Sequence, residues 1–156
     1  MNLKKKEFSL KKAKEYTLRL LKFRMRSESE LKHRLRLKGF DEEVIDKTIE
    51  FFKNNLLIDD LKFCRLWMEE RLKKPYGFYR VKDELRQKGI EEATIEKVFS
   101  EIKNNYNEEK VILNILKKKI TTLKDLPAER KKQRLYNFFL RRGFSPEVVS
   151  DLINRL

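Results

Sequence analysis

The segment LKGFDEEVI (residues 37–45) decides the fold, because it ends one helix and begins the next within a few residues. Gly39 can adopt the positive φ that stops a helix, Phe40 can make the apolar contact that closes such a stop, and Asp41 can cap the following helix. The same succession of residue types returns as QKGIEEATI (residues 87–95) and RRGFSPEVV (residues 141–149). Three copies of one helix boundary predict an array of structural repeats.

Apolar residues on both sides of the glycines occupy matching offsets in the three copies. The glycines themselves are 50 and 54 residues apart, so the third copy carries four additional residues. We expect these four in a longer connection before Pro127, a residue that suits the first turn of a helix. The matching apolar positions are Leu31, Val81 and Leu135; Leu35, Leu85 and Phe139; and Ile45, Ile95 and Val149.

Capping and stop signals predict nine helices, three in each copy. The first is expected over about residues 10–25 with Ser9 as its N-cap, and the second begins at a capping box formed by Ser27 and Glu30. Four glycines and three prolines are too few for long loops or a sheet-rich architecture. The predicted fold is therefore all-α, with a basic N-terminal arm over residues 1–8 and three tandem three-helix repeats over residues 9–58, 59–107 and 108–156.

The chain carries 39 Lys and Arg against 25 Asp and Glu, a formal net charge of +14. The excess is uneven: residues 1–58 carry +7, residues 59–107 carry +1 and residues 108–156 carry +6. Many carboxylates fall in the first turns of helices, where they favour the helix dipole, so the basic residues of the preceding helices are less neutralised. This pattern predicts salt-dependent attraction to phosphate backbones. The alternative is a lysine-rich composition that only keeps the protein soluble.

No pattern in the sequence predicts catalysis or a cofactor. His33 lies alone between two cations, and Cys64 lies on an apolar helix, where a buried and inert thiol is expected. Neither a phosphate-binding glycine loop nor a cluster of metal ligands is present, so we expect no enzyme activity, no metal and no cofactor. One cysteine excludes an internal disulfide, and no apolar run reaches membrane-spanning length. We expect a cytoplasmic protein that does not contact a membrane.

The stretch RLKKPYGFYR (residues 71–80) occurs only in the second copy. Pro75 cannot continue a helix and Gly77 permits a turn, so one interpretation of the stretch is purely structural. Its cations and tyrosines would also suit carboxylates, phosphates or stacked bases. From the sequence alone, both interpretations stay open.

The helix pairs around each glycine also suggest a DNA-binding helix-turn-helix, because the turn at residues 39–41 has about the right length. The helix that would enter the major groove begins with acidic residues in the first two copies, Asp41 and Glu91 among them. Carboxylates at that position oppose the approach to phosphates. Ordinary packing of three helices is therefore the favoured explanation.

These residues resemble the RecX family, the regulators of the RecA recombinase, over most of the chain from about Lys14 to its end. The third copy matches loosely, at residues 141–144 and Val149. The first matches at Arg26-Ser27, Glu30-Leu31, Leu35, Lys38-Gly39-Phe40 and Ile45. The second matches best, at Asp59-Asp60, Phe63, Trp67, Arg71, Lys74-Pro75-Tyr76-Gly77 and the run DELRQKGI over residues 83–90.

The resemblance implies an elongated, curved helical array that binds the RecA–DNA nucleoprotein filament along its groove. Such a protein mostly inhibits RecA, by blocking extension of the filament or promoting its disassembly, in DNA recombination, DNA repair and the SOS response. The implied partners are the RecA filament and, weakly and in a salt-dependent way, single- and double-stranded DNA. The expected state is a monomer. Two alternatives are a direct DNA-binding protein that uses its basic outer helices, and a helical scaffold for another acidic protein.

Two sets of candidate residues follow. For contact with the filament, the basic and aromatic residues of the second copy are the candidates: Arg71, Lys73, Lys74, Tyr76, Arg80 and Arg86. For contact with nucleic acid, the basic residues of the outer copies are the candidates: Lys32, Arg34, Arg36, Lys38, Lys131, Lys132, Arg134, Arg141 and Arg142.

Overall fold

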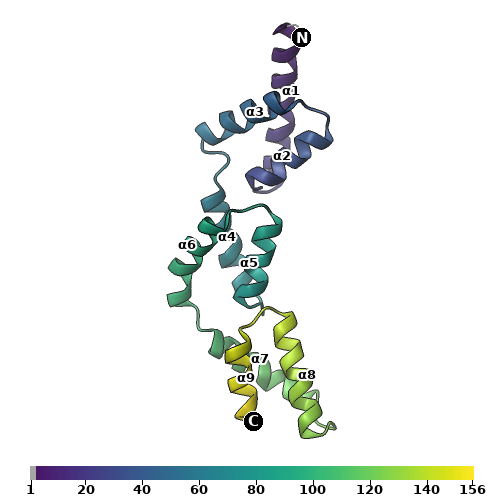
Figure 1. Cartoon of the computed structure of the whole chain (residues 1–156), viewed down its shortest axis with the longest axis vertical. Helices are drawn as coiled ribbons and strands as arrows, with labels where there is room; N and C mark the ends of the chain where they lie inside the picture. Colours follow the sequence, from purple (N-terminus) through teal and green to yellow (C-terminus); the bar gives the residue numbers. More distant parts are fainter. Residues whose placement is uncertain (1–2) are drawn as a thin grey trace.

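A computed structural model describes residues 3–156, and in this part of the chain every regular element is a helix (Figure 1). The all-α class predicted from the sequence is confirmed. A short 3-10 turn, η1 (Lys103–Asn105), follows the sixth helix. The α-helices are α1 (Leu3–Phe23), α2 (Glu28–Leu37), α3 (Glu42–Asn54), α4 (Asp60–Leu72), α5 (Phe78–Gln87), α6 (Glu92–Ile102), α7 (Glu108–Thr121), α8 (Ala128–Arg141) and α9 (Pro146–Asn154).

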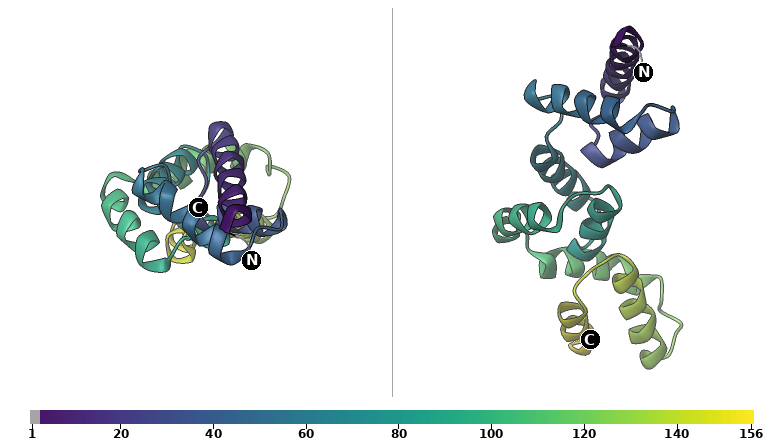
Figure 2. Two further views of the ribbon diagram at one scale, coloured as in Figure 1. Left: turned by 90° about the horizontal axis from the view of Figure 1, so that it is seen from above. Right: turned by 45° about the horizontal axis from the view of Figure 1, so that its top comes forward.

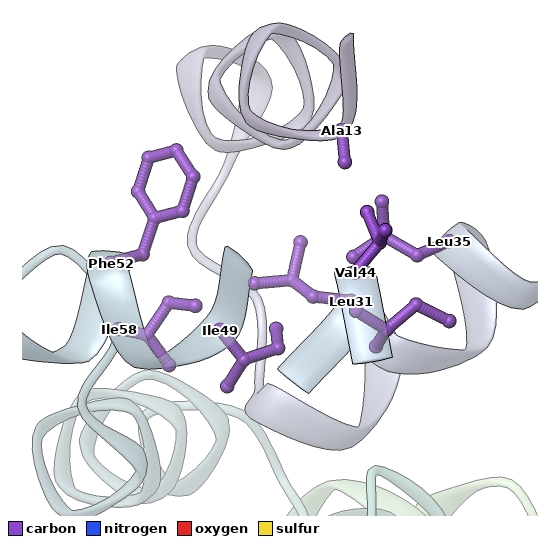
Figure 3. Packing of buried hydrophobic residues seen from close by; sticks show 8 residues of the cluster. Ala13, Leu31, Leu35, Val44, Ile49, Phe52 and Ile58 are labelled. Atoms are coloured by element: carbon purple, nitrogen blue, oxygen red, sulfur yellow. The ribbon is translucent and has the colours of Figure 1, made fainter. Parts of the chain in front are cut away.

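Three separate hydrophobic cores hold the helices in consecutive groups of three. One core draws on α1–α3, the second on α4–α6 and the third on α7–α9. In the first, Ala13 of α1 faces Leu35 and Val44 (Figure 3). Burying a leucine- or isoleucine-sized side chain stabilises the fold by about 1.5–3 kcal/mol, so each repeat has its own source of stability. The repeats follow one another along the long axis of the molecule, which confirms the tandem array (Figures 1 and 2).

The helix stops at the three glycines have the predicted geometry. Gly39, Gly89 and Gly143 have φ values of 83°, 73° and 78°. After each of them, the next amide donates to a carbonyl five residues earlier, as in a Schellman motif; for Phe40 the acceptor is the Leu35 oxygen at 3.3 Å. The capping box is also present: Ser27 Oγ accepts from the Glu30 amide at 3.2 Å, and the Glu30 carboxylate accepts from the Ser27 amide at 3.0 Å.

The first helix begins earlier than predicted. It starts at Leu3, so Ser9 lies inside the helix and does not cap it. Residues 3–8 of the predicted N-terminal arm are helical, and residues 1–2 lie outside the described part of the chain. The extension is held against α3, because Lys6 Nζ lies 2.7 Å from the Glu43 carboxylate.

The four additional residues of the third copy lie in a helix and not in the connection before Pro127. Helix α8 has 14 residues, whereas its counterparts α2 and α5 have 10 each. One further turn at the start of α8 therefore accounts for the wider glycine spacing. The turn forms because Ala, Glu, Arg and Lys, the residues at 128–131, all have high helix propensity.

The repeats are joined by one contact geometry that is used twice. The start of α2 rests on the turn after α5, where Ser27 Oγ donates to the Lys88 carbonyl at 2.5 Å. The start of α5 rests in the same way on the turn after α8: the Gly77 amide donates to the Arg142 carbonyl at 2.8 Å, and the Tyr79 amide to the Gly143 carbonyl at 3.0 Å. In each junction, the N-terminus of a middle helix contacts the glycine turn of the next repeat.

An ion pair strengthens the first junction. Lys88 Nζ of the second repeat lies 3.1 Å from the Glu30 carboxylate of the first. Burial disfavours ionisation of Glu30, but hydrogen bonds from Arg24, the Ser27 amide and Lys88 outweigh burial and lower the pKa of Glu30 to about 2. The carboxylate is therefore charged at neutral pH, and one side chain serves both the capping box and the junction.

Candidate binding surface at the second junction

The stretch at residues 71–80 joins the second repeat to the third. Gly77 is the N-cap of α5 and is buried against the turn after α8. A Cβ atom at Gly77 would lie 2.1 Å from the Gly143 carbonyl oxygen, so only glycine fits there. Tyr106 donates its hydroxyl hydrogen to the Tyr76 carbonyl at 3.2 Å, and Arg142 donates to the Pro75 carbonyl at 3.3 Å. The stretch therefore forms the predicted helix stop and turn, and a binding role stays a prediction.

The Glu84 carboxylate gathers three of the predicted contact residues on the second repeat. It accepts hydrogen bonds from Arg71 Nε at 2.7 Å, from Trp67 Nε1 at 3.1 Å and from Arg80 Nε at 3.2 Å. The ring of Tyr76 lies 4.6 Å from the Arg71 guanidinium and 4.0 Å from that of Arg80. Arg71, Tyr76 and Arg80 therefore form one network around Glu84.

The protonation of this network is fixed near neutral pH. Burial disfavours the ionised form of Glu84, but the hydrogen bonds from Arg71 and Arg80 outweigh it and lower the pKa of the carboxyl. The hydrogen bond to Glu84 in turn raises the pKa of Arg71. Because donors of both guanidinium groups are used inside the protein, Arg71 and Arg80 are less free to bind a partner than the sequence suggested.

Replacing Glu84 by glutamine should lower the free energy of unfolding by about 1–3 kcal/mol, because Arg71 and Trp67 lose an ionised acceptor in a half-buried site. Trp67 is the single tryptophan of the chain, so its emission maximum should shift in the folded variant. Denaturant unfolding followed by fluorescence measures both. The control is Glu101→Gln, which removes an exposed pair with Arg65 and should cost less than about 1 kcal/mol. Equal stability of the two variants would contradict the assigned role of Glu84.

A groove of about 590 Å³ lies between the second and third repeats, next to this network. We call it the junction groove. Its apolar part comes from both repeats and comprises Leu72, Pro75, Val111, Ile115 and Phe138. Its cations are Lys73, Lys74, Lys118, Lys119 and Arg142, and the remaining lining residues are Asn114 and Thr122. Among residues 3–156, no carboxylate lines the groove. The junction groove thus combines an apolar interior with positive charge.

The junction groove brings residues from both predicted sets together. Lys73 and Lys74 were expected to contact protein and Arg142 to contact nucleic acid, yet all three line the same groove. Lys73, the C-cap of α4, is also paired with Glu70 in the last turn of that helix. Arg142 lies 4.6 Å from the Phe138 ring and donates to the Pro75 carbonyl, so it has a structural role as well.

Sequence reasoning missed the contribution of α7 to the groove. The helical spacing of Val111, Ile112, Ile115 and Leu116 predicts that all four side chains point inward. Ile112 and Leu116 are indeed buried, whereas Val111 and Ile115 are half-buried and line the groove together with Lys118 and Lys119. The sequence does contain a signal for this surface, because the apolar face of α7 is wider than the packing of one three-helix core requires.

The solvent-facing side of α8 carries a row of arginines, Arg130, Arg134 and Arg141, all of them exposed. With exposed Asn137 they follow a spacing of four, three and four residues, which places them on one face of the helix. At 1.5 Å per residue, the row is about 16 Å long. We call it the arginine stripe. Arg130 lies in the additional turn of α8 and was not predicted.

Most of the positive charge of the third repeat lies in one segment. Residues 110–142 contain eleven Lys and Arg against two Asp and Glu. Within residues 3–156, none of these eleven cations forms an ion pair. Lys131 and Lys132 lie half-buried on α8, beside the arginine stripe. This charge stays available to an outside partner.

Several predicted residues in the first two repeats are engaged inside the protein instead. Lys32 lies 2.9 Å from Glu28, and Arg36 lies 2.5 Å from Glu42. Arg86 is held by Asp83 at 2.6 Å and Glu92 at 2.8 Å. Lys38 is exposed with its ammonium 5.3 Å from the Tyr16 ring, and Arg34 is exposed. The predicted basic residues therefore differ in whether they are held in ion pairs within the protein or are exposed to a partner.

The remaining sequence predictions concern single side chains. Cys64 is fully buried, as predicted, and burial raises the pKa of its thiol to about 11, which disfavours the reactive thiolate. His33 is exposed, as expected of a solvated side chain. Over residues 3–156, no group of three or more His, Cys, Asp and Glu side chains is placed to hold a metal ion. In the same part of the chain, no helix has both the length and the apolarity for crossing a membrane.

Comparison with protein families gives matches along nearly the whole chain. The model described as the first three-helix domain of RecX matches residues 13–52, that of the second matches residues 59–98, and that of the third matches residues 107–153. The regulatory protein RecX of Pasteurella multocida is 32% identical over 141 residues, which cover 90% of this chain and 85% of the relative. That of Clostridium beijerinckii is 29% identical, over 93% of this chain and 68% of the relative.

Solved structures share the fold at lower identity. The crystal structure of RecX from Lactobacillus salivarius has a TM-score of 0.83 and 18% identity, and the match covers 96% of each chain. A second crystal structure of a regulatory protein RecX has a TM-score of 0.82 and 22% identity, over 95% of this chain and 74% of the other. The three-repeat architecture is thus shared with chains whose sequences are very different.

Proposed function

The chain belongs to the RecX family, and from this premise we propose that it regulates the RecA recombinase by binding the RecA–DNA nucleoprotein filament along its groove. One observation carries the proposal: eleven cations of the third repeat form no ion pair with any residue of the described chain, and they lie next to a groove with an apolar interior. A nucleoprotein filament offers both phosphates and protein surface. A partner of that mixed kind matches a surface that is basic in one part and apolar in another.

The proposed mode of action is contact without catalysis. An elongated array of small repeats can span several neighbouring subunits of a helical filament, because each repeat presents its own surface. Bound along the groove, the chain would block addition of further RecA subunits or favour release of bound ones, and so mostly inhibit recombination, DNA repair and the SOS response. We further propose that it acts as a monomer in the cytoplasm.

The experiment that tests the proposal is hydrolysis of ATP by the host's RecA on single-stranded DNA, with this protein added well below one copy per RecA. Inhibition at such ratios supports action on the filament, because each bound molecule then affects many RecA subunits. An effect only when the protein saturates the DNA would contradict it. The arginine stripe favours a second candidate, direct DNA binding without RecA, and saturation-dependent inhibition is the result expected of that candidate.

The double variant Lys73→Glu/Lys74→Glu should require about tenfold more protein for half-inhibition of RecA, since roughly 1.4 kcal/mol of charge complementarity is lost at the junction groove. Its far-ultraviolet circular dichroism should be unchanged, because both lysines are exposed at the end of α4. The matched control is Lys97→Glu/Lys103→Glu, which reverses two exposed lysines elsewhere in the second repeat. Undiminished inhibition by the first variant would remove these lysines from the filament contact.

A further inference from the structure

We propose that the junction groove binds an acidic, amphipathic segment of a partner protein: two or three aliphatic side chains enter the groove, and flanking carboxylates meet its lysines. The inference deepens the proposed function, since it names the chemistry of the protein that one part of the surface recognises. The lining of the groove favours a protein segment over a nucleic acid.

The interior of the groove suits aliphatic side chains. Leu72 and Pro75 come from the second repeat, and Val111, Ile115 and Phe138 come from the third. All except exposed Pro75 are half-buried, which leaves apolar surface that the three cores do not cover. Removing such surface from water is favourable, so an occupant with apolar side chains gains affinity there. An apolar helix face laid into a groove is a common mode of peptide recognition.

The charges around the groove select an acidic occupant. Five cations line it, Lys73, Lys74, Lys118, Lys119 and Arg142, without a carboxylate among the lining residues. Only Lys73 of these five forms an ion pair within residues 3–156. An approaching carboxylate therefore meets uncompensated positive charge, and a basic segment would be repelled.

The one aromatic ring in the lining argues against a stacked base. Single-stranded nucleic acids bind to such surfaces by laying bases on exposed aromatic faces. Here Phe138 is half-buried, Lys119 Nζ lies over its ring at 4.8 Å and the Arg142 guanidinium lies over it at 4.6 Å. The ring is already engaged by two cations of the chain, so it offers a base little free surface. Aliphatic walls and acid-selective charge together fit a protein segment better.

The test measures fluorescence anisotropy of a labelled synthetic 14-residue peptide in the absence of RecA and DNA. The peptide carries leucines at i, i+3, i+4 and i+7 and glutamates on its other face, and a scrambled peptide keeps the composition but loses the apolar stripe. We expect binding of the first in the micromolar range and at least about tenfold weaker binding of the second. Equal binding of both would mean attraction by charge alone and would overturn the inference.

Two matched variants test whether the peptide binds in the junction groove. Lys118→Glu/Lys119→Glu reverses two groove lysines and should weaken binding of the amphipathic peptide at least about tenfold. Lys110→Glu/Lys117→Glu reverses two exposed lysines of the same helix outside the groove and should bind the peptide as the parent does. Labelled oligothymidylate is the second probe. If the groove variant loses the oligonucleotide and keeps the peptide, the occupant is nucleic acid and the inference is wrong. Because no RecA is present, failure here leaves the ATP hydrolysis test of the proposed function intact.

Discussion

Replacing Gly143 by alanine should lower the free energy of unfolding by about 3 kcal/mol or more and uncouple the third repeat from the second. The φ of Gly143 is +78°, where a residue with a Cβ atom costs about 1–2 kcal/mol. The added Cβ would also lie 2.3 Å from the Arg80 amide nitrogen, so the two backbones must separate. Separation breaks the bonds from Gly77 to Arg142 and from Tyr79 to Gly143, each worth about 1 kcal/mol.

Alanine variants of two other glycines separate the cost of backbone strain from the cost of the steric clash at the junction. Gly39→Ala imposes the same backbone strain, because its φ is +83°, but its Cβ would have nothing within 4 Å. We expect a loss of about 1 kcal/mol for it. Gly77→Ala carries no such strain, since its φ is −87°, but its Cβ would lie 2.1 Å from the Gly143 oxygen. Its loss should be about 2 kcal/mol, through the same two hydrogen bonds.

The measurement is urea unfolding followed by two probes. Trp67 is half-buried and packs against the core of the second repeat, so its fluorescence reports that repeat, whereas far-ultraviolet circular dichroism reports all helices. In a coupled array the two transitions coincide, and weakening one junction separates them. Gly143→Ala and Gly77→Ala should show separate transitions, and Gly39→Ala should not. If Gly143→Ala and Gly39→Ala unfold alike, the second junction contributes nothing to stability.

The comparison of these glycines shows what the sequence could and could not predict. Local signals are enough to place a helix stop, because the αL residue and its flanking apolar contact are neighbours in sequence; all three stops were predicted correctly. The contact of Gly143 with Gly77 and Arg80 joins residues more than 60 positions apart. No local pattern encodes it. The three glycines look equivalent in sequence, yet Gly89 and Gly143 lie at junctions between repeats, whereas a Cβ atom at Gly39 would have nothing within 4 Å.

The additional turn of α8 illustrates a second limit. A spacing of 54 residues instead of 50 reveals an insertion but not its place. Pro127 suits the start of a helix, so we expected the four residues in the connection before it. Pro127 marks where α8 starts but does not reveal how long the helix is. The residues at 128–131 are good helix formers, and they extend α8 by one turn. The error affected the candidate site, since Arg130 was overlooked.

Charge was the least specific of the signals. Composition gives the surplus of cations but not their partners, and ion pairs form between side chains that the fold brings together. Arg36 and Arg134 are equally plausible phosphate contacts in the sequence. In the structure, Arg36 is held by Glu42, whereas Arg134 lies exposed on the arginine stripe.

Replacing the stripe by glutamines, in the variant Arg130→Gln/Arg134→Gln/Arg141→Gln, should weaken binding to single-stranded DNA between tenfold and a hundredfold. Each exposed arginine without an ion pair can release counterions when it meets a phosphate. Three lost contacts should make the plot of log K against log salt shallower by about 2, given a slope of roughly 0.7 per contact on single strands. Fluorescence anisotropy of a labelled oligonucleotide, repeated over a range of salt concentrations, measures both quantities.

The matched control separates position from net charge. Lys6→Gln/Lys47→Gln/Arg65→Gln removes the same three positive charges, but each of these residues is paired with a carboxylate, at 2.7, 3.2 and 2.7 Å. A cation that already has an anionic partner gives less to a phosphate, because binding must first replace that pair. We therefore expect the control to keep most of its affinity and nearly all of its salt slope. Equal losses in the two variants would mean that DNA senses only the net charge of the chain, and the arginine stripe would then not be a binding surface.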